Sequence, residues 1–291
     1  MSLSKTVFGD FELYTIETGD IKLDGGAMFG VVPKTLWSRG IEPDEKNRIS
    51  MTMRCLLIKS NKTGKVYLVD NGVGTKFNEK MMDIYQIDFT KKELGKSLRA
   101  QGFNFEDITD IIFTHLHFDH CGGSTYFGDT GEIEYTFPHA TYHVTKRHWE
   151  TAINPNDREK ASFLKENIEP IGKSGKLNLV NDNATFEPGL SAIVVNGHTL
   201  GQQLPKIESE GKTIVFMADL LATHVHLPLP WVMGYDMYPT ETLVEKKAFI
   251  KEAEEKGWHL FLQHDLEKEI IQLGYDSKRY TIKNTLSLSD I

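Results

Sequence analysis

The sequence feature that most constrains this chain is a cluster of metal-ligand side chains directly behind a short apolar strand. Residues Thr114–Gly123 read Thr-His-Leu-His-Phe-Asp-His-Cys-Gly-Gly and follow the apolar run Ile111-Ile112-Phe113. Burying three imidazoles and a carboxylate there is costly unless they share a ligand such as a metal ion. Side chains that carry chemistry commonly lie on loops held by a rigid sheet. The cluster therefore predicts a metal-binding loop at the edge of a sheet, rather than a polar loop with chance histidines.

The spacing within the cluster predicts how its side chains are presented. In an extended segment His115, His117 and Asp119 would share one face, while the apolar residues between them would face the core. His120 could join this face if the chain turns there, and the adjacent Gly122-Gly123 pair makes such a turn possible. We therefore expect all four side chains to bind metal.

The kind of metal follows from the kind of ligand. Neutral imidazole and carboxylate suit zinc, iron or manganese. The chain has two cysteines, Cys55 and Cys121, which argues against a structural zinc site rich in cysteine. Two cysteines are also too few for a disulfide framework, and this favours a reducing compartment.

Composition limits the class of protein. With 291 residues, 40% of them hydrophobic and 25% charged, the chain has enough apolar material for a core, and we expect one α/β domain over residues 1–291. No stretch approaches the ~20 apolar residues of a membrane span, and the N-terminus lacks the pattern of a signal peptide, so we expect a cytoplasmic protein with no membrane partner. The net charge of −8 and the lack of a basic stripe argue against nucleic acid as a partner.

The chain alternates between predicted strands and helices, bounded by turn and capping signals. A capping box of Thr90 and Glu93 should start one helix, and Pro170 should end another. The expected strands are Phe8–Ile16, Met53–Ser60, Val66–Asp70, Asp110–Thr114, Ala140–Thr145, Leu177–Val180, Leu190–Val195, Thr213–Met217 and Leu260–Gln263. The expected helices are Thr90–Gln101, Lys146–Ile153, Asp157–Asn167 and Thr240–Lys256.

One cluster cannot complete two metal sites, and three further candidate ligands follow apolar strands later in the chain. They are His198, Asp219 and His264. Each alone would more often be a structural residue at a strand end. Taken together, in this order and behind the cluster, they predict that the second half of the chain completes the site.

With these residues in place, the chain resembles the metallo-β-lactamase superfamily, from the Val66–Gly72 stretch through His264. The resemblance implies a four-layer αββα sandwich with a binuclear site at one edge of the sheets. It implies two divalent metal ions, with zinc expected first and iron or manganese as alternatives. Carried over by position, it assigns His115, His117 and His198 to the first ion, Asp119, His120 and His264 to the second, Asp219 to both, and Asp70 to a supporting role.

Two further stretches, Leu23–Lys34 and Ala218–Asp236, resemble the quorum-quenching lactonase branch, which also includes organophosphate-hydrolysing relatives. The chain departs from that branch at two positions. Ala222 stands where several homoserine-lactone lactonases carry a tyrosine, three residues after the bridging aspartate, and Gln202 replaces the final histidine of a Gly-His-Thr-x-Gly-His run. The first departure leaves the substrate and one carbonyl-polarising group undefined.

The resemblance implies a hydrolytic mechanism. Two metal ions lower the pKa of a shared water, so that a hydroxide is available to attack an ester or lactone carbonyl. Asp119 is the candidate for passing a proton to the leaving oxygen while it also binds metal. The expected partner is a small lactone or ester, such as an acylated homoserine lactone.

Residues that could contact the substrate lie in the two lactonase-like stretches. Met28, Phe29, Trp231 and Tyr235 could form an apolar wall for an acyl chain, although ordinary core packing is the alternative. His224 lies in a proline-rich loop after Asp219 and could stand at the pocket rim. An exposed Gly-Gly-Ala-Met-Phe loop would also suit a contact between two copies of the chain, so a homodimer is a further hypothesis.

Other functions remain open at this stage. The same site could hydrolyse another ester, a thioester or a phosphotriester, because one hydroxide serves all of these. Nucleic-acid processing would need a basic surface. A redox role of flavodiiron type would normally replace the second histidine of the cluster with glutamate, whereas His117 is intact. A non-catalytic binding module would be expected to lose ligands, and none of the seven is missing.

Overall fold

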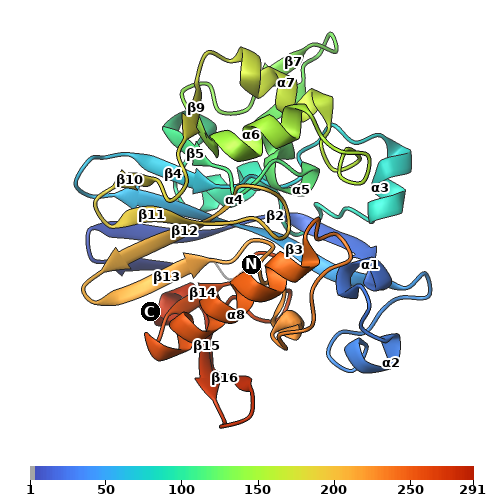
Figure 1. Ribbon diagram of the computed structural model, residues 1–291. Coiled ribbons are helices and arrows are strands. Elements are labelled where there is room, and N and C mark those ends of the chain that lie inside the picture. Colours follow the sequence, from blue (N-terminus) through green and yellow to red (C-terminus); the bar gives the residue numbers. More distant parts are fainter. Residues whose placement is uncertain (1–3) are drawn as a thin grey trace.

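The computed structural model describes residues 4–291 as two seven-stranded sheets packed face to face, with helices on both outer faces (Figure 1). The first sheet has the order β1-β2-β3-β4-β5-β8-β9, and the second has the order β10-β11-β12-β13-β14-β15-β16. Helices α4, α6 and α7 cover the first sheet, while α8 covers the second (Figure 1). This arrangement is the four-layer αββα sandwich expected from the sequence.

The strand bounds separate the two halves of the chain. The first sheet holds β1 Lys5–Phe8, β2 Phe11–Asp24, β3 Arg48–Ser60, β4 Val66–Val69, β5 Asp110–Ile112, β8 Thr141–Thr145 and β9 Leu177–Val180. The second holds β10 Thr185–Glu187, β11 Leu190–Val195, β12 Gln202–Ser209, β13 Lys212–Phe216, β14 His259–Phe261, β15 Ile270–Tyr275 and β16 Tyr280–Leu286. A separate hairpin is formed by β6 Thr125–Phe127 and β7 Ile133–Tyr135.

The helices are short apart from the last one. They are α1 Gly25–Phe29, α2 Lys34–Trp37, α3 Glu79–Tyr85, α4 Leu94–Ala100, α5 Phe118–Cys121, α6 Lys146–Ile153, α7 Lys165–Lys173 and α8 Pro239–Glu255. Four 3₁₀ turns occur at Phe105–Asp107, Gly122–Ser124, His224–His226 and Leu288–Asp290. Among residues 4–291, no helix is long and apolar enough to cross a membrane.

The main core lies between the two sheets. It joins Leu56 and Val69 of the first sheet to Ile207 and Phe216 of the second, and all four are fully buried. A second apolar cluster packs the other face of the first sheet against α4, α6 and α7. Burying a side chain of this size contributes roughly 1.5–3 kcal/mol. Leu56, Val69 and Phe216 lie on strands expected from the sequence, whereas Ile207 belongs to β12, which was not among them.

Two predicted elements have wrong boundaries near the first sheet. The predicted strand Phe8–Ile16 is broken at Gly9, which adopts a positive φ of 60° and turns the chain back so that Phe8 pairs with Phe11. The predicted helix at Thr90 begins only at Leu94, because the Glu93 side chain caps it by accepting the Gly95 N–H.

The predicted helix Asp157–Asn167 is also wrong. The Asn156 side chain accepts the backbone N–H groups of Arg158 and Glu159, and such a local turn competes with a helix. The helix forms later, as α7, and continues through Pro170, which removes one backbone N–H. The carbonyl left without that partner, on Glu166, accepts the Thr125 hydroxyl at 3.4 Å instead.

Parallel pairing places the cluster loop at the edge of the first sheet. Strand β5 lies between β4 and β8 and runs parallel to both. The cluster follows β5 directly, and in the second sheet β13 and β14 also run parallel to each other. The carboxyl ends of parallel strands meet at one edge of a sheet, which is where ligand-bearing loops can converge.

Candidate metal centre

All seven predicted ligands come together at one edge of the sandwich. His115, His117, Asp119 and His120 follow β5, whereas the other three come from the second sheet, after β11, β13 and β14. All seven residues are buried, and none is more than 8% exposed. They form two groups that could each hold an ion. The first is His115, His117, His198 and Asp219, and the second is Asp119, His120 and His264.

The first group is compact. The Nδ1 atom of His117 lies 3.0 Å from Nε2 of His115 and 3.2 Å from Nε2 of His198. The Oδ2 atom of Asp219 lies 3.4 Å from Nε2 of His115 and 3.2 Å from Nε2 of His198. Three imidazole nitrogens and one carboxylate oxygen thus surround a single point.

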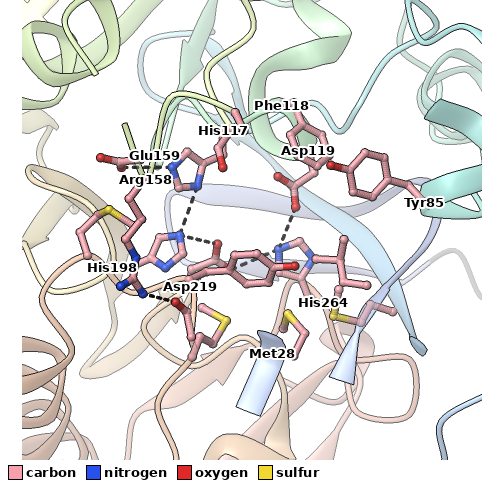
Figure 2. Close-up of a pocket in the computed structure, with 18 residues that line it drawn as sticks. Met28, Tyr85, His117, Phe118, Asp119, Arg158, Glu159, His198, Asp219 and His264 are labelled. Atoms are coloured by element: carbon pink, nitrogen blue, oxygen red, sulfur yellow. Dashed lines mark hydrogen bonds and ion pairs between the residues drawn. The ribbon is translucent and has the colours of Figure 1, made fainter. Parts of the chain in front are cut away.

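The second group shares the same aspartate. The Asp219 carboxylate lies 3.3 Å from Nε2 of His120 through Oδ2, and 3.3 Å from Nε2 of His264 through Oδ1. The Oδ2 atom of Asp119 is 3.6 Å from Nε2 of His120. It is 3.9 Å from Nε2 of His264 (Figure 2). Asp219 therefore lies between the two groups, as expected for a bridging ligand.

The outer nitrogens of the imidazoles decide what the inner nitrogens can do. His120 Nδ1 faces Asp70 Oδ2 at 2.9 Å, His198 Nδ1 faces Asp236 Oδ1 at 2.9 Å, and His264 Nδ1 faces the Thr52 carbonyl at 3.0 Å. These partners only accept hydrogen bonds, so each of these nitrogens carries a hydrogen. When the ring is neutral, as metal binding requires, the inner nitrogen then offers a lone pair.

His115 and His117 follow the same rule through other partners. The Thr114 hydroxyl donates to Asp70 and therefore accepts from His115 Nδ1, at 3.0 Å. His117 Nε2 donates to Glu159 Oε1 at 3.2 Å. All five imidazoles consequently present lone pairs to one another and to Asp219.

This arrangement fits metal ions. Facing lone pairs repel one another unless a cation lies between them. The Oδ1 atom of Asp219 is buried, and among residues 4–291 it has no hydrogen-bond partner, which is costly for a carboxylate without a cation. Imidazole and carboxylate ligands without cysteine suit zinc, iron or manganese equally. The donor set thus supports two divalent ions and leaves their identity open.

Without metal, the site is strongly polarised. Burial opposes the protonation of His198, but the carboxylates of Asp219 and Asp236 outweigh it and raise the pKa of His198 to about 10. Burial and the neighbouring histidines hold the pKa of His115 well below its usual range. Asp219 is buried too, yet the surrounding imidazoles hold its pKa well below the usual value. Such opposed shifts in one small volume are typical of a functional site.

Local backbone geometry explains why the cluster can reach this point. Strand β5 ends at Ile112, and Phe118–Cys121 form the helical turn α5. The expectation of one extended face through Asp119 is therefore wrong. Gly122 packs against the backbone of Val73, where an added Cβ would lie 2.1 Å from the carbonyl oxygen. This close approach lets the turn place Asp119 and His120 beside the second group.

Two residues next to the site have a left-handed backbone conformation. Asp70 has a φ of 57° and accepts both the backbone N–H and the hydroxyl of Thr114, which ties β4 to the start of the cluster. Ala218, directly before Asp219, has a φ of 41°. Such conformations cost roughly 1–3 kcal/mol and persist where the surrounding structure enforces them.

The metal-ligand groups form the floor of a cavity of about 280 Å³. Its walls are largely apolar, and they include the four methionines Met28, Met51, Met233 and Met237. Tyr85, at the end of α3, also lines the cavity and points its hydroxyl towards the Asp119 carboxylate (Figure 2). An apolar pocket with a few polar groups at one end is the usual form of a small-molecule site.

A model of the metallo-β-lactamase superfamily matches residues 54–264, a range that contains all seven ligands. The chain belongs to the metallo-β-lactamase superfamily. Its two facing sheets flanked by helices are the metallo-β-lactamase fold.

Relatives within the superfamily include lactonases. An N-acyl homoserine lactonase of Bacillus cereus is 27% identical over 176 residues, which cover 59% of this chain and 62% of that relative. The chain is thus matched over less than two thirds of this curated relative's length.

Solved structures extend the likeness across almost the whole chain. A probable metal-dependent hydrolase from Staphylococcus aureus has a TM-score of 0.86 and 29% identity, covering 97% of this chain and 100% of that one. The dizinc quorum-quenching lactonase AidC, in complex with a hydrolysis product, has a TM-score of 0.77 and 24% identity, with 96% of each chain covered. At 24% identity, the similarity to AidC shows a shared fold.

The residues predicted to contact substrate do not all meet at this metallo-β-lactamase cavity. Met28 and Tyr235 line it. Phe29 is fully buried between Trp37 and His226, and Trp231 packs edge-on against it.

The remaining members of the two lactonase-like stretches also lie elsewhere. His224 lines a different hollow, where its Nδ1 pairs with Asp265 at 2.5 Å. Ala222 is buried and lines only a small void beside Met233. Gln202 is fully buried at the start of β12.

Several functional residues were missed in the sequence. Tyr85, Arg158 and Glu159 line the cavity, and Asp236 holds His198. Tyr85 ends the short helix α3, and Glu159 lies in the irregular segment between α6 and α7. No periodic pattern in the sequence marks either residue. The signal that could have found Glu159 is the Asn154-Pro155-Asn156 run three residues before it, which is typical of a turn rather than of a helix.

Proposed function

We propose that this protein is a binuclear metal-dependent hydrolase that opens a lactone ring, with an N-acyl-homoserine lactone as the preferred kind of substrate. The observation that supports this most is the convergence of seven ligand residues, five of which line an apolar cavity. Lactonases of this family share part of the sequence, although the matched region covers only 62% of the Bacillus cereus enzyme. The partner would be a small molecule; nucleic acid and membrane are not expected.

The metal ions would be held by the seven ligands, with Asp219 shared between them. Bound together, two divalent ions would supply a hydroxide at neutral pH and polarise a carbonyl. Zinc is our first expectation for both ions. The rest of the chemistry belongs to the chain itself.

The chain's own residues would orient the substrate and move a proton. The methionine walls would hold an acyl chain, because thioether side chains adapt to flexible apolar ligands. Asp119 would accept a proton and deliver it to the leaving oxygen of the opened ring. Burial, and then the charge of Asp119, raise the pKa of Tyr85, so its phenol would stay a hydrogen-bond donor beside that carboxylate.

An ester, thioester or phosphotriester would use the same centre, and the walls of the cavity do not distinguish these classes. The test is a pH-stat assay of the zinc-loaded protein on acyl-homoserine lactones, a simple thioester and a phosphotriester. We expect kcat/KM to be highest for the lactones and to rise with acyl-chain length until the cavity is filled. A preference for the thioester or phosphotriester would replace the lactonase proposal, and cleavage of RNA would overturn it.

A further inference from the structure

Glu159 is a buried carboxylate that belongs to neither group of metal ligands. It lies in the irregular segment between α6 and α7 and is 2% exposed. Its Oε1 lies 3.2 Å from Nε2 of His117, on the side of the ring away from the metal centre (Figure 2). A buried carboxylate is costly unless it is paired, so this contact is a strong constraint on His117.

His117 differs from the other imidazoles of the centre. It faces the centre through Nδ1, whereas His115, His198, His120 and His264 face it through Nε2. A ring that binds through Nδ1 needs a hydrogen on Nε2. Glu159 can only accept a hydrogen bond there, so it selects the tautomer and the ring orientation that leave Nδ1 as a lone pair.

The segment around Glu159 is itself held in place. Asn156 accepts the backbone N–H of Glu159 at 3.0 Å, and its amide lies 3.4 Å from Oε2 of the same residue. Arg158 donates across the cavity mouth to the carbonyls of Gly234 and Asp236. These contacts hold the segment in place and keep the Glu159 carboxylate beside His117.

We propose that Glu159 is a positioning residue that fixes His117 in its Nδ1-coordinating form and thereby sets the affinity of the first metal ion. This inference rests on the binuclear site of the proposed function, but not on the choice of substrate. Residues that orient a metal-binding histidine in this way typically change metal affinity about 10–100-fold when removed.

The test measures metal binding rather than catalysis. Zinc is titrated into the metal-free full-length chain in competition with a chromophoric chelator, for the wild type, Glu159→Ala and Glu159→Gln. We expect Glu159→Ala to weaken the binding of one of the two ions about 10–100-fold. The affinity for the other ion should stay close to that of the wild type. Glu159→Gln should recover most of that loss, because its amide oxygen can accept the same hydrogen bond.

The control is Asp157→Asn, two residues away, whose side chain is 98% exposed and pairs only with Lys160. It should bind both ions as the wild type does. If Glu159→Ala unfolds, as judged by circular dichroism, Glu159→Met fills the space and takes its place in the comparison.

The outcomes separate this inference from the proposed function. A wild-type chain that binds fewer than two ions contradicts the binuclear site itself. Two wild-type-like affinities in Glu159→Ala overturn the positioning role alone. Equal losses in Glu159→Gln and Glu159→Ala would overturn the hydrogen-bond mechanism, because charge and not orientation would then be decisive.

Discussion

At the scale of single residues, the centre depends on which nitrogen of each imidazole carries a hydrogen. Every outer nitrogen meets an acceptor, such as Asp70 for His120 and Asp236 for His198. The inner lone pairs then converge around Asp219. A sequence shows which residues are histidines, but it cannot show which nitrogen points inward, because that depends on neighbours that are distant in the chain.

Asp219 is the residue that the two proposed metal ions would share. Replacing it in Asp219→Ala removes the shared carboxylate and leaves the imidazole groups without their common anion. We expect the variant to bind fewer than two ions and to lose activity by about 100-fold or more. Metal analysis by mass spectrometry checks the first point, with exposed Asp129→Ala as the control. Retention of two ions and full activity would contradict the bridging role.

The hydroxyl of Tyr85 is expected to donate a hydrogen bond to the polar end of the substrate. Removing its hydroxyl in Tyr85→Phe keeps the ring packed against Phe77 and Phe118 but deletes the donor beside Asp119. We expect kcat/KM for a lactone to fall about tenfold, the usual cost of one hydrogen bond to a polarised group. Tyr126→Phe, on the exposed hairpin strand β6, is the matched control. An unchanged kcat/KM would remove Tyr85 from substrate binding.

At the scale of elements, short turns at strand ends decide the geometry. The helical turn α5 carries Asp119 and His120 and approaches the backbone after β4 so closely that Gly122 has no room for a side chain. Likewise β5 is only three residues long and is held between β4 and β8. The position of the ligands therefore depends on backbone packing as well as on the ligands themselves.

Gly122→Ala tests the role of that close packing. An added Cβ would lie 2.1 Å from the carbonyl oxygen of Val73, so α5 or the loop after β4 must move. We expect a loss of about 1–3 kcal/mol in the free energy of unfolding, together with weaker binding of the second ion. Urea unfolding and zinc titration measure the two effects. Gly274→Ala, whose Cβ would meet its nearest neighbour at 3.4 Å, should change neither.

The carboxylate of Asp110, at the start of β5, should make the free energy of unfolding depend on pH. Burial opposes its ionisation, but hydrogen bonds from His143, Thr109 and Lys65 lower the pKa of Asp110 below its usual value. Because the folded pKa is lower than the unfolded one, the unfolded chain binds more protons. The stabilisation is therefore complete above pH ~4 and is lost as the pH falls through the folded pKa.

Asp110→Asn removes that stabilisation. We expect the variant to be about 1.5–3 kcal/mol less stable than the wild type at pH 7, and the difference to shrink below pH ~4. Urea unfolding of both proteins at pH 7 and pH 3 checks this. A difference that persists unchanged at pH 3 would show that charge is not its source.

At the scale of the whole molecule, the metal centre joins the two sheets. Four ligands follow β5 of the first sheet, and His198, Asp219 and His264 follow strands of the second. Elsewhere the sheets meet through apolar side chains of the main core. Ions at this edge would act as a cross-link that is present only in the folded chain.

Removing metal should therefore destabilise the protein. A ligand that binds only the folded state stabilises it by about 2.7 kcal/mol when its concentration is one hundred times its Kd. We expect chelation to lower Tm by several degrees, and zinc but not magnesium to restore it, because imidazole ligands disfavour magnesium. Scanning calorimetry of the metal-free and reloaded protein measures this. An unchanged Tm would argue against a metal cross-link between the two sheets.

Much of the fold could be predicted from local pattern. The apolar strands Val66–Val69, Leu190–Val195 and Leu177–Val180 were recognised, as was the long helix Pro239–Glu255 within one residue at each end. The sequence prediction also omitted β12, β15 and β16 of the second sheet. Several wrong boundaries fall where a side chain or one glycine overrides the pattern, as at Gly9, Glu93 and Asn156. These are contacts of a few atoms, which hydrophobic periodicity does not record.

The sequence by itself determined the ligand types, their order behind strands and the superfamily that they imply. Only the tertiary structure decided that Glu159 faces His117, that Asp236 faces His198, and that Tyr85 rather than His224 reaches the cavity. The physical reason is that a ligand's chemistry belongs to its own side chain. Its orientation and its hydrogen-bond partner belong to segments that meet only when the two sheets pack.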